Sequence, residues 1–237
     1  MDLRLKDKVA LVTGAGSQIG YGKAIALTLA EEGCHVIAAD IDLDGARQTA
    51  AAVEKLGRQA LAVKVDVTRQ GEVDDMVAKA IKKFGRIDIL ANNAGASSQL
   101  RPFLEMTEED WNFDIGVNLY GQMRVARAVL PHMIARKYGR IINTSGGQGI
   151  PNISIYGAAK AGVVMFTKAL AREVAAQGVI VNAVGPGLGK TGLVYRAPPE
   201  FLEGERQRSA LKRLCTPEDV APVVAFLASD RCSYMVG

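Results

Sequence analysis

The chain has 237 residues, of which 49% are hydrophobic, and a formal net charge of +4. This length supplies the core of one sizeable α/β domain and too little for two. Its cations are interleaved with acids and are not accompanied by an aromatic platform, which argues against nucleic-acid binding.

The first predicted elements are a short apolar strand at residues 8–13, a glycine-rich turn, and a helix at residues 23–32. The turn contains Gly14, Gly20 and Gly22. Glycines let the backbone approach a pyrophosphate, and the positive end of the helix dipole favours an anion. The strand, the turn and the helix together predict a phosphate cradle for a dinucleotide.

A second strand, residues 34–40, ends on a carboxylate, Asp40. An acid at this place accepts hydrogen bonds from an adenosine ribose and repels a 2′-phosphate. We therefore predict NAD as the cofactor in preference to NADP.

Further strands are predicted at residues 59–65, 87–91 and 140–145, separated by helices of roughly a dozen residues or more. Such alternation predicts crossover connections and a parallel sheet buried on both faces. The expected fold is α/β, a Rossmann-like doubly wound parallel sheet in a single domain that spans residues 1–237.

Tyr156 is followed four residues later by Lys160 in a stretch rich in helix formers. Residues four apart lie on the same face of a helix. A cation about 4 Å away favours a phenolate by up to roughly 4 kcal/mol, or about 3 pK units. The pair therefore predicts a tyrosine that acts as a general acid and base.

Motifs in six regions of the chain resemble those of the short-chain dehydrogenase/reductase family, over essentially the whole length and in the family's order. They are the glycine turn with Asp40, Asp66-Val67 after the third strand, Asn92-Asn93-Ala94-Gly95 after the fourth, Asn118, Tyr156 with Lys160, and Pro186-Gly187 with Thr191.

The resemblance implies a role for each motif. The implied cofactor contacts are Gly14, Gly20, Gly22, Asp40, Asp66 and Val67 (near the adenine), Asn93, Ala94, Gly95, Tyr156, Lys160, and Pro186, Gly187 and Thr191 (near the nicotinamide). It also implies that Tyr156 exchanges a proton with the substrate and that Lys160 hydrogen-bonds the nicotinamide ribose. Asn118 would hold a water that relays protons from Lys160 to solvent.

The glycine turn departs from the family pattern. Gly14 is separated from Gly20 by five residues, and Asp40 lies correspondingly late, which favours a two-residue insertion. The longer turn makes Gly16 and Ile19 less secure as contacts than the three glycines named above.

The end of the fifth strand departs as well. Gly146 falls in the column where the family has its catalytic serine, and the loop to Tyr156 is shorter than usual. A carbonyl that awaits hydride needs a hydrogen-bond donor beside the tyrosine. Ser145 is the predicted replacement, with Ser154 and Gln148 as alternatives.

We predict an NAD(H)-dependent oxidoreductase that interconverts a secondary alcohol and a ketone. The alternatives are an NADPH-dependent 3-oxoacyl-thioester reductase and, in another class, a nucleotide-sensing binding protein that has lost catalysis. A basic cluster, Lys190, Arg196, Arg206 and Arg208, would suit an anionic or CoA-type substrate or would be ordinary surface charge. An enoyl reductase fits poorly, because the resemblance gives that class a longer Tyr–Lys spacing.

Location and partners are also predicted. The first residues are charged, and the apolar stretch at residues 220–228 is about half as long as a bilayer span. The three cysteines lack the spacing of metal ligands. These features predict a cytoplasmic protein without a metal site. The expected partners are a small-molecule alcohol or ketone and other copies of the chain, as a homotetramer or homodimer by family resemblance. By the same resemblance, family members continue past residue 237 into a final strand, so we expect either that the sequence is incomplete or that the protein lacks an edge element that often supports subunit contacts.

Overall fold

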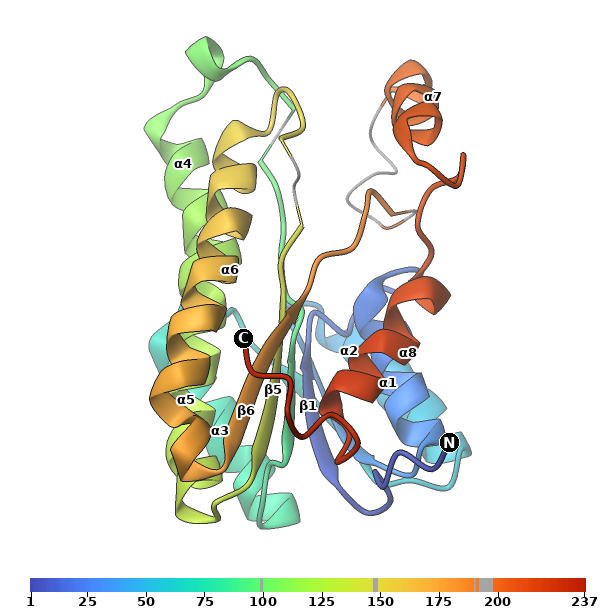
Figure 1. The fold of residues 1–237 in the computed structure, drawn as a ribbon, viewed down its shortest axis with the longest axis vertical. Helices are drawn as coiled ribbons and strands as arrows, with labels where there is room; N and C mark the ends of the chain where they lie inside the picture. Colours follow the sequence, from blue (N-terminus) through green and yellow to red (C-terminus); the bar gives the residue numbers. More distant parts are fainter. Residues whose placement is uncertain (99, 147–148, 190, 192–197) are drawn as a thin grey trace.

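The structure is a computed structural model and describes residues 1–98, 100–146, 149–189, 191 and 198–237. One six-stranded parallel sheet runs in the order β3-β2-β1-β4-β5-β6 (Figure 1). The strands are β1 (Val9–Thr13), β2 (His35–Asp40), β3 (Ala60–Lys64), β4 (Ile89–Asn92), β5 (Gly139–Thr144) and β6 (Val179–Val184). The predicted doubly wound α/β fold is confirmed, and the predicted strands lie within two residues of the observed ones.

Helices cover both faces of the sheet (Figure 1). The α-helices of the described chain are α1 (Tyr21–Glu31), α2 (Leu43–Lys55), α3 (Gln70–Phe84), α4 (Glu108–Ile115), α5 (Gly121–Ala135), α6 (Ser154–Val174), α7 (Pro199–Arg208) and α8 (Pro217–Ala228), and α7 projects beyond the end of the sheet (Figure 1). The buried side chains of α1, α2 and α8 form one hydrophobic core, and those of α3, α5 and α6 form the other. The sheet is therefore sandwiched between two helical layers.

The central strand β1 shows why its sequence is apolar throughout. Ala10 and Val12 pack into the first core, whereas Val9 and Leu11 pack into the second, because successive side chains of a strand point to opposite faces. The strand has β2 on one side and β4 on the other, so the direction of winding reverses here. Ligands of such sheets bind at this reversal, beyond the carboxyl ends of the strands.

Helix N-termini are capped in different ways. Thr107 with Asp110 on α4 and Thr216 with Asp219 on α8 form capping boxes, and Asp42 caps α2. By contrast, Gly20 before α1 and Ile153 before α6 provide no side-chain cap. Helices α1 and α6 both begin at the candidate site described below.

The last residues of the chain lie beside β6. The backbone N–H of Gly237 donates to the carbonyl of Val181 (3.0 Å), and the side chain of Asn182 donates to the carbonyl of Met235 (2.9 Å). Residues 229–237 form no strand. Within the described parts of the chain, we find no helix that combines the length and the apolar character needed to cross a bilayer.

Candidate active site

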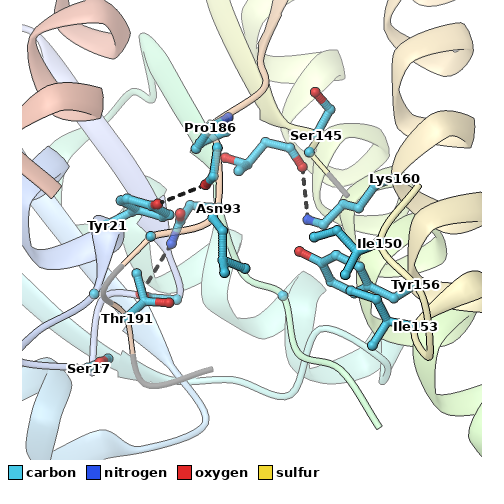
Figure 2. A pocket seen from close by; sticks show the side chains of 18 of the residues that line it. Ser17, Tyr21, Asn93, Ser145, Ile150, Ile153, Tyr156, Lys160, Pro186 and Thr191 are labelled. Atoms are coloured by element: carbon cyan, nitrogen blue, oxygen red, sulfur yellow. Dashed lines mark hydrogen bonds between the residues drawn. The ribbon is translucent and has the colours of Figure 1, made fainter. Parts of the chain in front are cut away.

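A cavity of about 620 Å³ opens at the carboxyl ends of the strands (Figure 2). Its walls come from the glycine turn, the ends of β4, β5 and β6, and the first turn of α6. The predicted site residues that line it are Gly14, Gly20, Asp40, Asn93, Gly95, Ser145, Tyr156, Lys160, Pro186, Gly187 and Thr191. The fold thus brings together residues that are far apart in the sequence.

The glycine turn has the close backbone packing of a phosphate cradle. Gly14 has φ +69°, and a Cβ there would lie 2.9 Å from the Cα of Ala94. A Cβ on Gly22 would lie 2.0 Å from the carbonyl oxygen of Gly14. Because α1 has no side-chain cap, its first backbone N–H groups are left for an anion. These residues fit a dinucleotide pyrophosphate.

Asn93 and Thr13 fix the shape of this cradle. The Thr13 hydroxyl oxygen accepts the backbone N–H groups of Asn93 and Ala94, both at 3.0 Å. In return the Asn93 side-chain nitrogen donates to the carbonyls of Thr13 (3.0 Å) and Gly14 (3.3 Å). Asn93 therefore ties the end of β4 to the turn after β1.

The extra length of the turn is folded against the start of α2. The Gly16 N–H donates to Oδ2 of Asp40 (2.7 Å), and Gln18 donates to the carbonyls of Gly16 (2.8 Å) and Gly45 (3.0 Å). A Cβ on Gly16 would lie 2.7 Å from Cγ of Asp40. The turn therefore packs directly on the carboxylate, whose Oδ1 also accepts the Asp42 N–H at 2.9 Å.

Tyr156 and Lys160 lie side by side on one wall of the cavity (Figure 2). Lys160 is 2% exposed, and its Nζ donates to the carbonyl of Thr144 at 2.9 Å. The same Nζ lies 5.5 Å from the centre of the Tyr156 ring. Burial lowers the pKa of Lys160 to about 8, so this lysine exchanges its proton close to neutral pH.

The electrostatics of Tyr156 differ from the expectation. We predicted that Lys160 would lower the pKa of the phenol, but burial raises the pKa of Tyr156 to about 12 and the charge of Asp114 adds to the rise. The ammonium is buried and donates to the Thr144 carbonyl, and the phenol is largely desolvated although it lines the cavity. The protein alone therefore holds Tyr156 in its protonated form at neutral pH.

Asn118 lies behind this pair, in a π-helical segment, Gly116–Tyr120. Its Nδ2 donates to the carbonyls of Ala96 (2.5 Å) and Asp114 (2.9 Å). Its Oδ1 is buried and has no hydrogen-bond partner within the described chain. A Cβ on Gly95 would lie 2.8 Å from that oxygen and 3.2 Å from Nζ of Lys160, so glycine leaves a gap between the two polar atoms.

Ser145 lines the cavity, but its hydroxyl is turned toward β6. The hydroxyl donates to the carbonyl of Val184 at 3.2 Å, and in Figure 2 it points away from the Tyr156 hydroxyl. The structure thus does not place it as the third donor. Of the alternatives, Ser154 directs its hydroxyl to the sulfur of Met106 (3.7 Å), and Gln148 lies outside the described residues.

Some predicted contacts do not line the cavity. These are Gly22, Asp66, Val67, Ala94 and Asn118. Asp66 accepts the N–H (2.9 Å) and the hydroxyl (2.7 Å) of Thr68, which organises the turn after β3. Val67 is buried and packs near Gly121, where a Cβ would lie 2.8 Å from its methyl group.

One lining residue that the sequence did not single out is Tyr21. Its hydroxyl lies 3.4 Å from the Gly187 carbonyl, to which it donates, on the wall opposite Tyr156 (Figure 2). A Cβ on Gly189 would lie 1.7 Å from the same hydroxyl. An aromatic residue between Gly20 and Gly22 was the feature of the sequence that could have identified this contact. Tyr21 joins the glycine turn to the loop after β6.

The described arginines near α7 are all paired with acids. The pairs are Arg206–Glu203 (2.6 Å), Arg208–Glu205 (2.6 Å) and Arg213–Asp219. Lys190 and Arg196, the other predicted basic residues of this region, lie outside the described residues. Neutralised pairs give an anionic substrate little net attraction.

A family model described as enoyl-(acyl carrier protein) reductase matches residues 14–237. The chain is 40% identical over 238 residues to the 3-oxoacyl-[acyl-carrier-protein] reductase FabG of Thermotoga maritima, covering 99% of this chain and 96% of the relative. It is also 40% identical over 234 residues to cis-4-hydroxycyclohexanecarboxylate dehydrogenase of Sinomonas cyclohexanicum, covering 98% and 93%.

A solved structure with the same fold is that of carveol dehydrogenase from Mycobacterium avium in complex with NAD. It superposes with a TM-score of 0.91 at 29% identity and covers 98% of this chain and 95% of that chain. The resemblances therefore extend over essentially the whole length of both partners.

Proposed function

The chain belongs to the short-chain dehydrogenase/reductase family, and from that premise we propose that it is an NAD(H)-dependent oxidoreductase that interconverts a secondary alcohol and a ketone. One observation carries the proposal. Tyr156 and the buried Lys160 line the same cavity as the glycine turn and Asp40, so a proton donor and a nucleotide cradle share one space. That is the arrangement that hydride transfer with coupled proton transfer requires.

Several residues of the chain would hold the cofactor. The glycine turn and the N-terminus of α1 would bind the pyrophosphate, and Asp40 would bind the adenosine ribose. Lys160 would reach the nicotinamide ribose, beside the loop that contains Pro186, Gly187 and Thr191. NAD(H), when bound, supplies the acceptor or donor of the hydride.

The protein's own part is to move a proton. In reduction, Tyr156 donates its phenolic proton to the oxygen that forms from the carbonyl, and in oxidation it takes the alcohol proton. Lys160, which is protonated below a pKa of about 8, restores that proton. Asn118 and the gap at Gly95 would hold the water through which Lys160 exchanges with solvent.

A neutral secondary alcohol or ketone suits the described lining better than an anionic thioester. Ile150, Ile153 and Leu188 present apolar surface to the cavity, and Arg208 is already paired with Glu205. The dehydrogenases of carveol and of cis-4-hydroxycyclohexanecarboxylate, by their names, act on cyclic alcohols, of which the first is neutral and the second carries a carboxylate. The similarity to the 3-oxoacyl-[acyl-carrier-protein] reductase of Thermotoga maritima supports the 3-oxoacyl alternative. The family description names enoyl reduction, but the four-residue spacing between Tyr156 and Lys160 argues against that reaction.

A pure nucleotide sensor is the alternative of another class. Tyr156, Lys160 and Asn118 argue against it, because a sensor has no use for a buried lysine beside an accessible phenol. We also propose a cytoplasmic homodimer or homotetramer. Exposed aromatic residues near α4 support self-association, among them Trp111 and Phe103, whose rings are stacked at 5.9 Å. Light scattering of the purified protein tests the oligomer.

The activity is tested with a panel of secondary alcohols and NAD, including cyclic, linear and carboxylate-bearing members, with NADH formation as the readout. We expect turnover of neutral cyclic alcohols. The 3-oxoacyl alternative is tested in the same plate with a 3-oxoacyl thioester and NADPH. NADH binding without turnover of any substrate would favour the sensor.

The cofactor preference is tested at Asp40. The wild-type protein should bind NADH more tightly than NADPH, because the carboxylate repels a 2′-phosphate. Asp40→Ala should reduce that preference several-fold, with Asp44→Ala as the control, since Asp44 is exposed and paired with Arg47. Equal binding of both nucleotides by the wild-type protein would contradict the assignment.

A further inference from the structure

The side chain of Tyr21 joins two parts of the cavity wall that are far apart in the sequence (Figure 2). Tyr21 is the first residue of α1, and because helical side chains tilt toward the N-terminus, its ring reaches past the end of the helix. Its hydroxyl donates to the carbonyl of Gly187, in the loop after β6, at 3.4 Å. The ring also packs against the first core, as do Val184 and Cys215. Tyr21 therefore links the hydrophobic core to the loop after β6.

Gly189, in the same loop, leaves the space that the Tyr21 side chain occupies. A Cβ on Gly189 would lie 1.7 Å from the Tyr21 hydroxyl oxygen, 2.6 Å from Cζ and 3.3 Å from Cε1 of the same ring. These distances are shorter than the roughly 3.5 Å at which non-bonded atoms reach their best separation. Gly189 does not have a positive φ, so its backbone conformation alone would allow another residue. The ring of Tyr21, and not a turn, therefore requires glycine at this position.

The main chain at Gly189 is also tied to the segment that precedes α8. Gly189 and Cys215 form an isolated parallel bridge, and the Cys215 N–H donates to the Leu188 carbonyl at 3.0 Å. The Thr191 N–H donates to the Gly189 carbonyl at 2.7 Å. Leu188, Gly189 and Thr191 all line the cavity. The position of Gly189 therefore determines where this part of the wall lies.

We propose that Tyr21 is a positioning residue for the cofactor, because its ring, packed against Gly189, sets how far the loop after β6 lies from the glycine turn. The proposal rests on the proposed function, in which the turn binds the pyrophosphate and the loop lies beside the nicotinamide. One dinucleotide then contacts both segments, so their separation has to match its length. A separation that is fixed before binding increases affinity, because less conformational entropy is lost when the cofactor binds.

The test is a double-mutant cycle on NADH affinity. Gly189→Ala alone should weaken NADH binding about tenfold, because the added methyl group displaces either the ring or the loop. Tyr21→Ala alone should weaken it by a similar factor, since the loop is no longer held. In the Tyr21→Ala background, Gly189→Ala should change the affinity less than about twofold, because the methyl group enters the space that the ring has left. NADH fluorescence titration measures the four dissociation constants.

Further variants separate this contact from hydrogen bonding and from glycine substitution in general. Tyr21→Phe keeps the ring and loses only the 3.4 Å hydrogen bond, so NADH affinity should fall less than about threefold. The matched control is Gly204→Ala on α7, where φ is not positive and no neighbour outside the helix lies within 4 Å of an added Cβ. It should leave NADH affinity unchanged in both backgrounds. If Tyr21→Ala did not fold, Tyr21→Leu, which keeps an apolar contact with the core, would replace it in the cycle.

Thermal melting measures the same contact without cofactor. Gly189→Ala should lower Tm by roughly 2 to 4 °C in the wild-type background and by less than about 1 °C in Tyr21→Ala. In all variants kcat should stay within about threefold of the wild type while KM for NADH rises, a split that a merely structural role would not produce. If the wild type bound NADH but turned over no alcohol, the proposed function would fail while the affinity cycle still judged Tyr21. Equal weakening of NADH binding by Gly189→Ala in both backgrounds would overturn the proposal.

Discussion

The amino ends of the strands form one rim of the sheet, the amino edge, and their carboxyl ends form the other, the carboxyl edge. Each rim carries a tyrosine close to cationic side chains, but the hydroxyl groups of the two tyrosines have different surroundings. At the amino edge, Tyr138 donates its hydroxyl to Asp230 at 2.8 Å, and its ring lies under Lys8 (3.8 Å) and Arg140 (5.0 Å). At the carboxyl edge, Tyr156 lies beside Lys160, but its hydroxyl faces the cavity (Figure 2). Burial raises the pKa of both phenols.

This comparison separates burial from chemical competence. A tyrosine whose proton is committed to a carboxylate and whose ring is enclosed by cations stabilises the fold. A partly buried tyrosine that is open to a cavity and next to a lysine that titrates near neutral pH has the geometry that proton transfer needs. A tyrosine with a cation nearby is therefore not sufficient to identify an active site, and the geometry of its hydroxyl decides.

The largest effect is expected when the same hydroxyl is removed at each edge. Tyr156→Phe should lower kcat by roughly 10²- to 10⁴-fold with little change in NADH affinity, because the proton is used in the transition state and not in cofactor binding. The matched control, Tyr138→Phe, should leave kcat unchanged and cost about 1 kcal/mol of stability. Steady-state kinetics and NADH fluorescence titration measure these quantities. Near-normal turnover by Tyr156→Phe would refute the mechanism.

The amino edge should respond in stability alone. Asp88 is fully buried, accepts the Val9 N–H at 2.8 Å and pairs with Arg86 (2.6 Å) and Arg136 (3.4 Å). Asp88→Ala should lower the free energy of unfolding by about 3 kcal/mol, since it removes one partner of a buried ionic network. At this chain length, the melting temperature should fall by roughly 6 to 12 °C. A lower kcat per folded molecule would show that the two edges are coupled.

The carboxyl edge should respond to pH. The pKa of Lys160 is about 8, so its charge is present below that pH and is lost above it. Ketone reduction should therefore be constant below about pH 7 and fall by up to tenfold per unit above about pH 8, whereas alcohol oxidation should rise over the same range. Initial rates at saturating cofactor in both directions provide the measurement. Parallel profiles for the two directions would contradict a shared proton donor.

The sequence predicted which residues lie at the carboxyl edge better than it predicted their burial and their pKa values. Glycine spacing and the Tyr156–Lys160 offset reflect backbone requirements and helix periodicity, which are local, so the sequence could identify the residues that the fold brings to one cavity. The burial of Asp114 and its hydrogen bonds to Ser98 could not be predicted, because they depend on how α4 packs in the folded chain. Likewise, the raised pKa of Tyr156 comes from burial, which a spacing of four residues does not reveal.

Ser145 gives the smallest expected effect. If its hydroxyl donated a hydrogen bond to the oxyanion, removing that hydroxyl would lower kcat by about 10²- to 10³-fold. Its hydroxyl instead bonds to the Val184 carbonyl, to which its own backbone N–H also donates at 2.9 Å, so Ser145 is held against the end of β6. We therefore expect Ser145→Ala to lower kcat less than roughly threefold, and Ser154→Ala to behave in the same way.

The neighbouring backbone explains why so small an effect is compatible with catalysis. Gly146 follows Ser145, has φ +124° and lines the cavity, so a main-chain group is present where the family has a serine. Main-chain N–H groups stabilise oxyanions as well as hydroxyls do. Kinetics of the two single variants and of the double variant decide the question. A hundredfold loss in Ser145→Ala alone would mean that the strand end rotates when substrate binds, and it would return Ser145 to the role of third donor.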